Sequence, residues 1–418
     1  MPKIIIVGGG AAGFFAAIVA AELSPFFQVI LLEAGAEPLA KVRISGGGRC
    51  NVTHACFDLA TLVQYYPRGG KALRGAFSRF QPQDTIAWFV QRGVALKTEG
   101  DGRLFPTTDD SETIVHCLRR SAAEAGVEVR VRCPVVAVDP PKLPESERFR
   151  VQLRDGTTLE SDRLLLATGS SPAGYRLAAQ LGHRIVPPVP SLFTFQIADE
   201  VGVPSLKSLA GISVSGVALH LEVSKGLDHR EILTQTGDVL ITHWGLSGPA
   251  ILKLSAWGAR LLHDAQYQAQ LHIHWCHPTS PEVVRQCLAQ LKQEVARKQL
   301  ANYRPLNVPQ RLWHYLLNVQ AIDGEKRWAD LSKMELQRLT QGLTRSTYSI
   351  QGKGSFKDEF VTCGGIDLKN VNFKTMESRI CPSLYFAGEI LDIDGVTGGF
   401  NFQSAWTTGW LAAQGITA

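Results

Sequence analysis

The sequence predicts an α/β fold in which both ends of the chain contribute to one parallel sheet and the middle forms an insertion. Three observations support this. An apolar strand pattern at residues 3–7 leads into a glycine-rich turn and a helix pattern, and a second strand–glycine–helix pattern spans 384–413. Short alternating segments between 191 and 275 are typical of antiparallel strands. The order of these patterns indicates an α/β domain interrupted by a β domain.

Composition limits the class of protein and the number of domains. A chain of 418 residues, 45% hydrophobic and 19% charged, is globular and long enough for two or three domains. Its 43 basic residues are scattered and the formal net charge is only +5, so we expect no nucleic-acid partner. The eight cysteines form no CxxC pair, which predicts reduced thiols and a soluble, cytoplasmic protein. Glycines interrupt the apolar run at 4–21, so we expect neither a signal peptide nor a membrane span.

The N-terminal turn carries a Gly-x-Gly-x-x-Gly pattern on Gly8, Gly10 and Gly13. The first glycine allows a tight turn, the second lets a pyrophosphate approach the backbone, and the third lets the helix at 11–23 pack on the strand. The helix N-terminus then offers free N–H groups to the phosphates. The second strand ends at Glu33, where a carboxylate can accept hydrogen bonds from ribose hydroxyls. An acidic residue there disfavours a 2′-phosphate, so FAD or NAD fits this turn and NADP does not.

A second glycine-rich segment, KVRISGGGRCN, covers residues 41–51. Three consecutive glycines between Lys41, Arg43 and Arg49 predict a flexible loop whose backbone can lie against a flat ring or an anionic group. The alternative is an ordinary surface loop. Cys50 has no neighbouring cysteine, so a small structural thiol is favoured over a redox-active one.

Two further strand ends predict ligand contacts. One strand ends in Ala167-Thr168-Gly169, a small-residue turn of the kind on which ligands sit in open α/β sheets. Another ends in Gly388-Glu389, whose carboxylate suits polyol hydroxyls. GVTGGFNFQ follows it and leads into a helix pattern over 403–413, whose start can donate to a flavin ring carbonyl. The alternative is a packed strand–turn–helix without a ligand.

These stretches together resemble the BaiN/RdsA-type family of NAD(P)/FAD-dependent oxidoreductases, conserved flavoproteins similar to aminoacetone oxidases. The matching segments are IIIVGGGAAG, KVRISGGGRCNVTH, GRLFPTTD, LLLATGSSP, GDVLITHWGLSGPAIL, FVTCGGIDL and YFAGEILDIDGVTGGFNFQSAWTTG. The resemblance implies a glutathione-reductase-type FAD-binding Rossmann domain with an inserted antiparallel β-barrel domain and a small helical insertion. The implied domains are FAD-binding at 1–190 and 356–418, β-barrel at 191–275 and 346–355, and helical at 276–345.

The resemblance also implies which residues line FAD: Gly8, Gly10, Gly13, Glu33, Arg43, Gly48, Val135, Gly169, Glu389, Gly399, Asn401 and Phe402. The motifs themselves add their neighbours Ala12, Lys41, Gly47, Asn51, Thr168, Gly388 and Phe400. Val135 is included because a strand at that place often supplies backbone contacts to adenine. The phenylalanines at 400 and 402 depart from the family, which often has Tyr and Leu there, so different side chains would pack beside the ring.

Candidate catalytic groups come from two other segments. His243, in the loop THWGLSGP, could act as an acid or base near neutral pH, although a structural histidine is the favoured alternative. Arg103, like Arg49, could bind a substrate carboxylate or could simply be solvated. His272, His274 and His277 lie close to Cys276, but the run ends in His-Pro without a second ligand group, so we predict no metal site.

Three functional hypotheses remain. The leading one is an FAD-dependent oxidoreductase that transfers hydride through non-covalent FAD, with NAD(P)H as donor and a small molecule as substrate. The second is a flavin-binding protein that acts through RNA or protein association, suggested by the basic stretch at 285–311. The third is an NAD-dependent dehydrogenase without flavin, against which the GGFNFQ segment argues.

Overall fold

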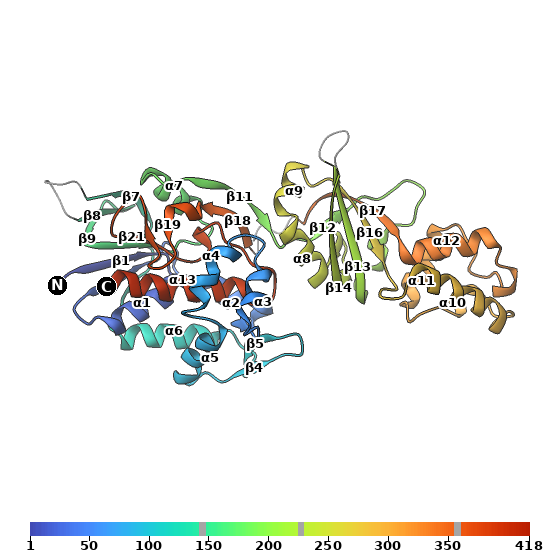
Figure 1. The fold of residues 1–418 in the computed structure, drawn as a ribbon, viewed down its shortest axis with the longest axis horizontal. Helices are drawn as coiled ribbons and strands as arrows, with labels where there is room; N and C mark the ends of the chain where they lie inside the picture. The colour runs from blue at the N-terminus through green and yellow to red at the C-terminus, as the bar shows by residue number, and fades with distance from the viewer. Residues whose placement is uncertain (142–147, 225–229, 355–360) are drawn as a thin grey trace. The chain divides into compact units, whose positions relative to one another are not determined.

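The computed structural model of the chain describes residues 1–141, 148–224, 230–354 and 361–418. Two compact units divide it: Met1–Val189 with Val361–Ala418, and Pro190–Phe360 (Figure 1). The two ends of the chain therefore build one unit and the middle builds the other. The predicted junction at 355/356 lies outside the described residues, and the finer three-part division stays a prediction.

The first unit is built on a seven-stranded sheet. In spatial order its strands are β19 (Val371–Asn372), β20 (Glu377–Ser378), β21 (Leu384–Phe386), β10 (Arg163–Leu166), β1 (Lys3–Val7), β2 (Gln28–Leu32) and β6 (Glu128–Arg130). The five strands from β21 to β6 pair in parallel. Buried β-branched and leucine side chains on β1, β2 and β10 explain this arrangement, because a parallel sheet is covered on both faces.

Helices and three small sheets complete this unit. The helices are α1 (Ala11–Leu23), α2 (Ala40–Gly48), α3 (Leu59–Leu62), α4 (Gly70–Phe77), α5 (Pro82–Gln91), α6 (Glu112–Glu124), α7 (Pro172–Gln180) and α13 (Phe400–Thr417). The small sheets join β3 (Thr53–His54), β5 (Arg103–Pro106) and β4 (Leu96–Thr98); β7 (Val135–Asp139), β8 (Phe149–Leu153) and β9 (Thr158–Ser161); and β11 (Ile185–Ser191) with β18 (Val361–Ile366). Helices α1 and α13, from opposite ends of the chain, pack directly against each other (Figure 1).

The second unit contains the predicted antiparallel barrel. It closes in the order β12 (Phe195–Ile197), β15 (Gly245–Ser247), β14 (Arg230–Ile241), β13 (Ser213–Ser224), β16 (Ala269–His274) and β17 (Ser346–Lys353). Its helices are α8 (Pro249–Trp257), α9 (Ala259–Asp264), α10 (Pro281–Glu294), α11 (Gln310–Val319) and α12 (Lys333–Thr344). The last three form the predicted helical insertion. The capping box of Ser332 and Glu335 at the start of α12 is also confirmed.

Two glycine-rich segments differ from the sequence expectation. The loop expected at 41–51 begins as helix α2, and departs from helical geometry only at Ser45, Gly46 and Gly47. Helix α13 begins at Phe400, three residues before the expected start, because Gly399 caps it with a left-handed φ of 94°. In both places glycine allows a backbone reversal directly at a helix end.

Candidate cofactor site

The turn between β1 and α1 is shaped by its glycines. Gly8 has a φ of 114°, and a Cβ atom there would lie 2.3 Å from the carbonyl oxygen of Ala167. A Cβ atom on Gly13 would lie 1.9 Å from the carbonyl oxygen of Gly8. A Cβ atom on Gly10 would meet nothing within 4 Å. Packing therefore explains the first and third glycines, whereas the second faces open space.

Gly10 is also the N-cap residue of α1. No side chain caps this 13-residue helix, and its first turn holds no acidic residue. The N–H groups and the positive end of the helix dipole are therefore free to receive an anion. Open space in front of an uncapped helix is the geometry that a pyrophosphate requires.

Glu33 follows β2 and faces the same turn. Its Oε2 accepts a hydrogen bond of 2.7 Å from the N–H of Gly9, and its Oε1 accepts one of 2.6 Å from the N–H of Gly35. These bonds hold the carboxylate beside the glycine turn while leaving further lone pairs for ribose hydroxyls.

Two buried hydroxyl groups follow β10, one in the turn after the strand and one on helix α7. Thr168 Oγ1 and the Tyr175 hydroxyl are buried, and neither has a hydrogen-bond partner among the described residues. Burial raises the pKa of the Tyr175 phenol, and the nearby carboxylates of Glu389 and Asp392 raise it further. Buried hydroxyls normally find a partner, so these two fit a polar ligand at this strand end.

Glu389 joins segments that are far apart in the sequence. Its Oε2 lies 2.6 Å from Lys41 Nζ, and its Oε1 accepts a hydrogen bond of 3.0 Å from the N–H of Thr362. Lys41 also donates to Ser170 Oγ over 3.1 Å. Helix α2, the turn after β10 and the segment after β21 thus meet at one carboxylate, with the Lys41 cation beside it.

The start of α13 is held by side-chain amides. In the orientation that satisfies its hydrogen bonds, Asn51 accepts from the N–H of Gly399 over 2.9 Å and donates to the carbonyl of Thr53 over 3.0 Å. Asn401 donates to the carbonyl of Gly395 and accepts from its N–H, both over 2.8 Å. These contacts fix the glycine turn, so both asparagines act here on the protein backbone.

The two phenylalanines of this segment belong to aromatic clusters. Phe400 is buried, and its ring stacks on Tyr65 with centroids 4.3 Å apart and on His54 at 4.6 Å. Phe402 stacks on Trp406 at 5.6 Å. The Phe400 side chain is therefore a packing group, and a contact of this residue to a cofactor would come from its backbone.

Sequence reasoning missed two polar groups under the site. Gln403 on α13 is fully buried; its Oε1 accepts from Thr53 Oγ1 over 2.5 Å and from Thr85 Oγ1 over 3.0 Å, and its Nε2 donates to Thr407. Arg68 donates two hydrogen bonds to the fully buried carboxylate of Asp394. A glutamine inside an apolar helix pattern was the only signal for the first group. The second joins residues 326 positions apart, and the sequence carries no signal for it.

The remaining predicted cofactor residues lie at several places in the first unit. Arg43 donates to Glu112, so its charge is already balanced on α6. Gly47 and Gly48 have left-handed φ values and would leave a Cβ atom in open space. Ala12 is buried in the first turn of α1. A Cβ atom on Gly388 would lie 2.7 Å from the Cβ atom of Ala12. Val135 is buried at the start of β7.

The two candidate catalytic residues belong to different units. Arg103 makes ion pairs with Glu99 at 2.8 Å and Asp101 at 2.7 Å. Arg49 pairs with the same Glu99 at 2.7 Å and lies over the ring of Phe105. His243 is an exposed residue between β14 and β15 of the other unit. The catalytic roles of His243 and Arg103 therefore stay predictions.

The structure accounts for the role of Cys50. It is fully buried, and burial raises the pKa of its thiol to about 12. A thiol with that pKa stays protonated and unreactive at neutral pH. This agrees with the structural role expected from the sequence.

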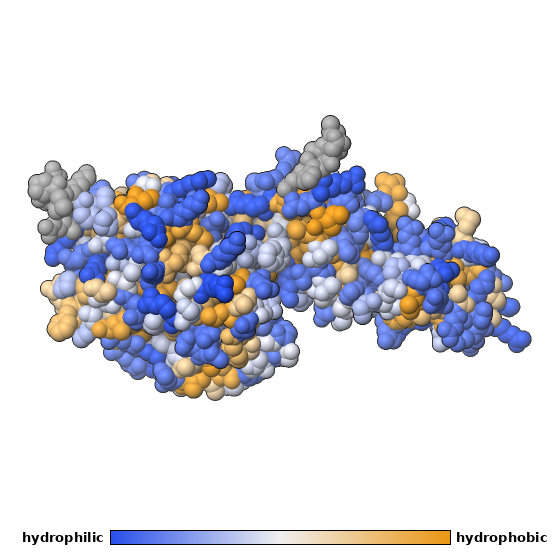
Figure 2. All heavy atoms as spheres, in the orientation of Figure 1, coloured by the Kyte–Doolittle hydropathy of each residue, from blue (hydrophilic) through white to orange (hydrophobic). Residues whose placement is uncertain are grey.

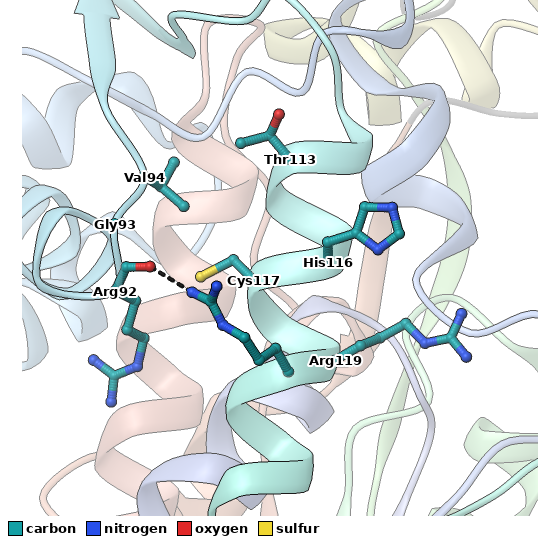
Figure 3. A pocket seen from close by; sticks show the side chains of 8 residues that line it. Arg92, Gly93, Val94, Thr113, His116, Cys117 and Arg119 are labelled. Atoms are coloured by element: carbon teal, nitrogen blue, oxygen red, sulfur yellow. Dashed lines mark hydrogen bonds between the residues drawn. The ribbon is translucent and has the colours of Figure 1, made fainter.

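A separate pocket of about 570 Å³ lies beside α6 (Figure 3). Arg92, Val94, His116 and Cys117 are among its lining residues, and none of the predicted site residues lines it. Arg120, another lining residue, donates to the carbonyl of Arg92. The Arg92 guanidinium is engaged by Glu22 and by the face of Trp88. The pocket therefore stands apart from the glycine turns.

Within the described ranges, no group of three or more His, Cys, Asp or Glu side chains is arranged to hold a metal ion. No helix among the same residues is long and apolar enough to cross a bilayer.

A parallel sheet with an uncapped helix start, a ribose-type carboxylate after the second strand and a returning C-terminal helix defines a Rossmann dinucleotide-binding protein. The chain matches the family described as "HI0933-like protein Rossmann domain" over residues 2–415, and it belongs to that family. It is a flavoprotein oxidoreductase with a Rossmann FAD-binding domain.

Two curated relatives illustrate the range of this family. The chain is 29% identical over 430 residues to a ribosomal RNA dihydrouridine synthase of Escherichia coli, covering 99% of this chain and 98% of that protein. It is 27% identical over 422 residues to a 3-dehydro-bile acid delta(4,6)-reductase of Clostridium scindens, with the same coverage.

Solved structures share the fold. A 3-ketosteroid delta1-dehydrogenase from Sterolibacterium denitrificans has a TM-score of 0.50 and 12% identity, with both chains fully covered. An Escherichia coli quinol fumarate reductase FrdA has a TM-score of 0.50 and 14% identity, covering 100% of this chain and 70% of that one.

Proposed function

We propose that the chain is an FAD-dependent reductase that uses NAD(P)H as donor and reduces a carbon–carbon double bond conjugated with a carbonyl group. The observation that carries the cofactor assignment is Gly10, which faces open space at an uncapped helix start between two glycines that packing requires. Bound non-covalently, FAD would supply two-electron hydride chemistry.

The residues have distinct roles in this proposal. Gly10 and the first turn of α1 bind the pyrophosphate, and Glu33 binds the ribose hydroxyls. Glu389, held by Lys41 and the backbone of Thr362, accepts hydrogen bonds from polyol hydroxyls. The hydroxyls of Thr168 and Tyr175 provide further partners for the same ligand. The start of α13 presents backbone N–H groups and a positive dipole end to a ring carbonyl.

The type of acceptor is inferred from the relatives. A dihydrouridine synthase and a delta(4,6)-reductase are both named for reactions that remove a carbon–carbon double bond. In uracil and in a 3-oxo dienone this bond is conjugated with a carbonyl, so one hydride-transfer chemistry serves both. The sequence expectation of a small-molecule substrate therefore widens to include a uracil base of RNA.

Anaerobic spectroscopy tests this function. The purified protein, loaded with FAD, is mixed with NADH or NADPH, and the visible flavin absorbance is followed. We expect one donor to bleach it and a conjugated acceptor, either 4-androstene-3,17-dione or polyuridylic acid, to restore it. Free FAD with the same reagents is the control. Flavin that stays oxidised with both donors, or stays reduced with both acceptors, contradicts the proposal.

A further inference from the structure

The net charge of the chain is concentrated in the helical insertion. Residues 276–345 hold eleven basic and six acidic side chains, a formal net charge of +5, which equals that of all 418 residues. The rest of the chain is neutral in sum. A charge that looks scattered over the whole sequence is therefore located in one sixth of it.

Within the insertion, two segments pair antiparallel. The N–H of Leu300 donates to the carbonyl of Lys326 over 2.9 Å, the N–H of Trp328 donates to that of Lys298 over 3.0 Å, and Gln299 forms a β-bridge with Arg327. Trp328 is buried, and its ring stacks on that of Trp313 with centroids 6.2 Å apart. The pairing is thus anchored on a packed core.

This pairing brings three cations close together along the backbone. Arg327 lies opposite Gln299 in the β-bridge, and Arg297 and Lys298 directly precede Gln299 at the end of a turn. Arg297, Lys298 and Arg327 are all exposed. No described residue forms a side-chain ion pair or hydrogen bond with Arg297, Lys298 or Arg327. We call these three residues the basic face.

Some other cations of the insertion do have acidic partners. Nearby, Lys326 pairs with Glu335 at 2.9 Å and Arg285 pairs with Glu282 at 2.7 Å. Counter-charges are therefore available in the insertion, and they balance other cations. Closely spaced cations without internal partners repel one another and favour binding of a polyanion.

The neighbouring loop adds an aromatic group. Tyr303 is 42% exposed and is followed by the exposed Arg304. An exposed aromatic ring beside cations is the combination on which nucleotide bases stack while phosphates are neutralised. Figure 2 shows a mostly hydrophilic surface over α10 to α12, which suits a polyanion better than an apolar partner.

We propose that the basic face, with Tyr303 beside it, is a phosphate-binding surface for RNA, so that the insertion recruits the substrate of the proposed reductase. This inference rests on the proposed function for its biological sense. Binding itself needs no turnover, so the two can fail separately. The sequence predicted no nucleic-acid partner because the total charge is small. This proposal relies instead on the local charge of the insertion.

The test compares two triple variants with the wild-type protein, using oxidised, FAD-loaded full chain. The first is Arg297→Gln, Lys298→Gln and Arg327→Gln. The matched control removes three exposed cations from the first unit: Arg150→Gln, Arg154→Gln and Lys369→Gln. The probe is a fluorescein-labelled RNA hairpin with a uridine-containing loop, titrated by fluorescence anisotropy at several NaCl concentrations.

We expect the basic-face variant to bind the hairpin at least about tenfold more weakly at 50 mM NaCl, with a salt slope lower by roughly 2, because three phosphate contacts are lost. The control should stay within about twofold. Both triple variants remove the same charge, so equal weakening would overturn the proposal. Absence of wild-type binding at 50 mM NaCl, or binding to phosphatidylserine vesicles but not to the hairpin, would also overturn it.

Flavin reduction by NADH or NADPH in the same preparations separates the two proposals. An unchanged bleaching rate in the basic-face variant with weakened RNA binding supports both. RNA binding through the basic face by a protein whose flavin neither donor reduces would leave the surface standing and refute the proposed reductase.

Discussion

Replacing Gly10 with alanine separates folding from cofactor binding. The residue has φ −88° and ψ −169°, which any residue can adopt, and a Cβ atom there meets nothing within 4 Å. The substitution should therefore leave the fold intact, and the loss of backbone freedom in the unfolded chain should stabilise it by about 0.4–1 kcal/mol. Gly13→Ala is the contrasting variant, because its Cβ atom would lie 1.9 Å from the Gly8 carbonyl oxygen.

The same methyl group should oppose FAD. It would occupy the space in front of the first turn of α1, where the pyrophosphate accepts hydrogen bonds from N–H groups. Losing one such charge-assisted bond costs about 1.5–3 kcal/mol. Because 1.4 kcal/mol is a factor of ten, the dissociation constant of FAD should rise by about 10- to 100-fold.

The assay is paired. Urea denaturation of the FAD-free protein reports the fold, and quenching of flavin fluorescence on titration reports binding. Gly13→Ala should lose about 1–3 kcal/mol of stability through overpacking. Gly10→Ala should keep its stability and lose affinity. Wild-type affinity in Gly10→Ala would refute the assignment of this turn to the pyrophosphate.

Three further predictions concern the surrounding structure. Arg68→Met leaves the buried Asp394 carboxylate without its guanidinium and should destabilise the protein by about 3–5 kcal/mol in urea denaturation, whereas Arg68→Met with Asp394→Asn should recover part of the loss. Cys50, whose thiol pKa is raised to about 12 by burial, should resist iodoacetamide at pH 8 in the native protein while the partly exposed Cys133 reacts, and equal labelling of the two would contradict this. Hydrogen bonds from Ser332 and Lys326 lower the pKa of Glu335 from 4.5 to about 2, so its stabilisation is complete above pH 4.5 and is lost as the pH falls towards 2. Glu335→Gln should therefore cost roughly 2–3 kcal/mol at pH 7 and nothing near pH 2, and a pH-independent difference in urea denaturation would contradict the linkage.

Much of the fold could be predicted because local and global patterns agree. The strand at 3–7 and the helix at 11–23 have the predicted bounds, since a buried β-branched run and a glycine turn leave few alternatives. The helix α13 began earlier than expected because its start depends on Gly399, a left-handed glycine whose N–H is bound by Asn51 from 348 positions away. Periodicity alone does not contain that contact.

The site was harder to predict for the same reason. Motifs led to the prediction of Gly10, Glu33 and Glu389 as cofactor residues, because they follow the ends of strands. They did not identify Gln403 or the Arg68–Asp394 pair, because burial of a polar side chain is decided by distant segments. His243 and Arg103 were proposed as catalytic from residue type alone, and these roles stay predictions.

The nucleotide released from the purified protein shows whether the chain binds FAD. Acid precipitation of protein expressed without added flavin, followed by chromatography of the supernatant, identifies the nucleotide and its amount per chain. We predict FAD, released intact because it is held non-covalently, approaching one molecule per chain. FMN, NAD, or no nucleotide even after incubation with FAD would contradict it.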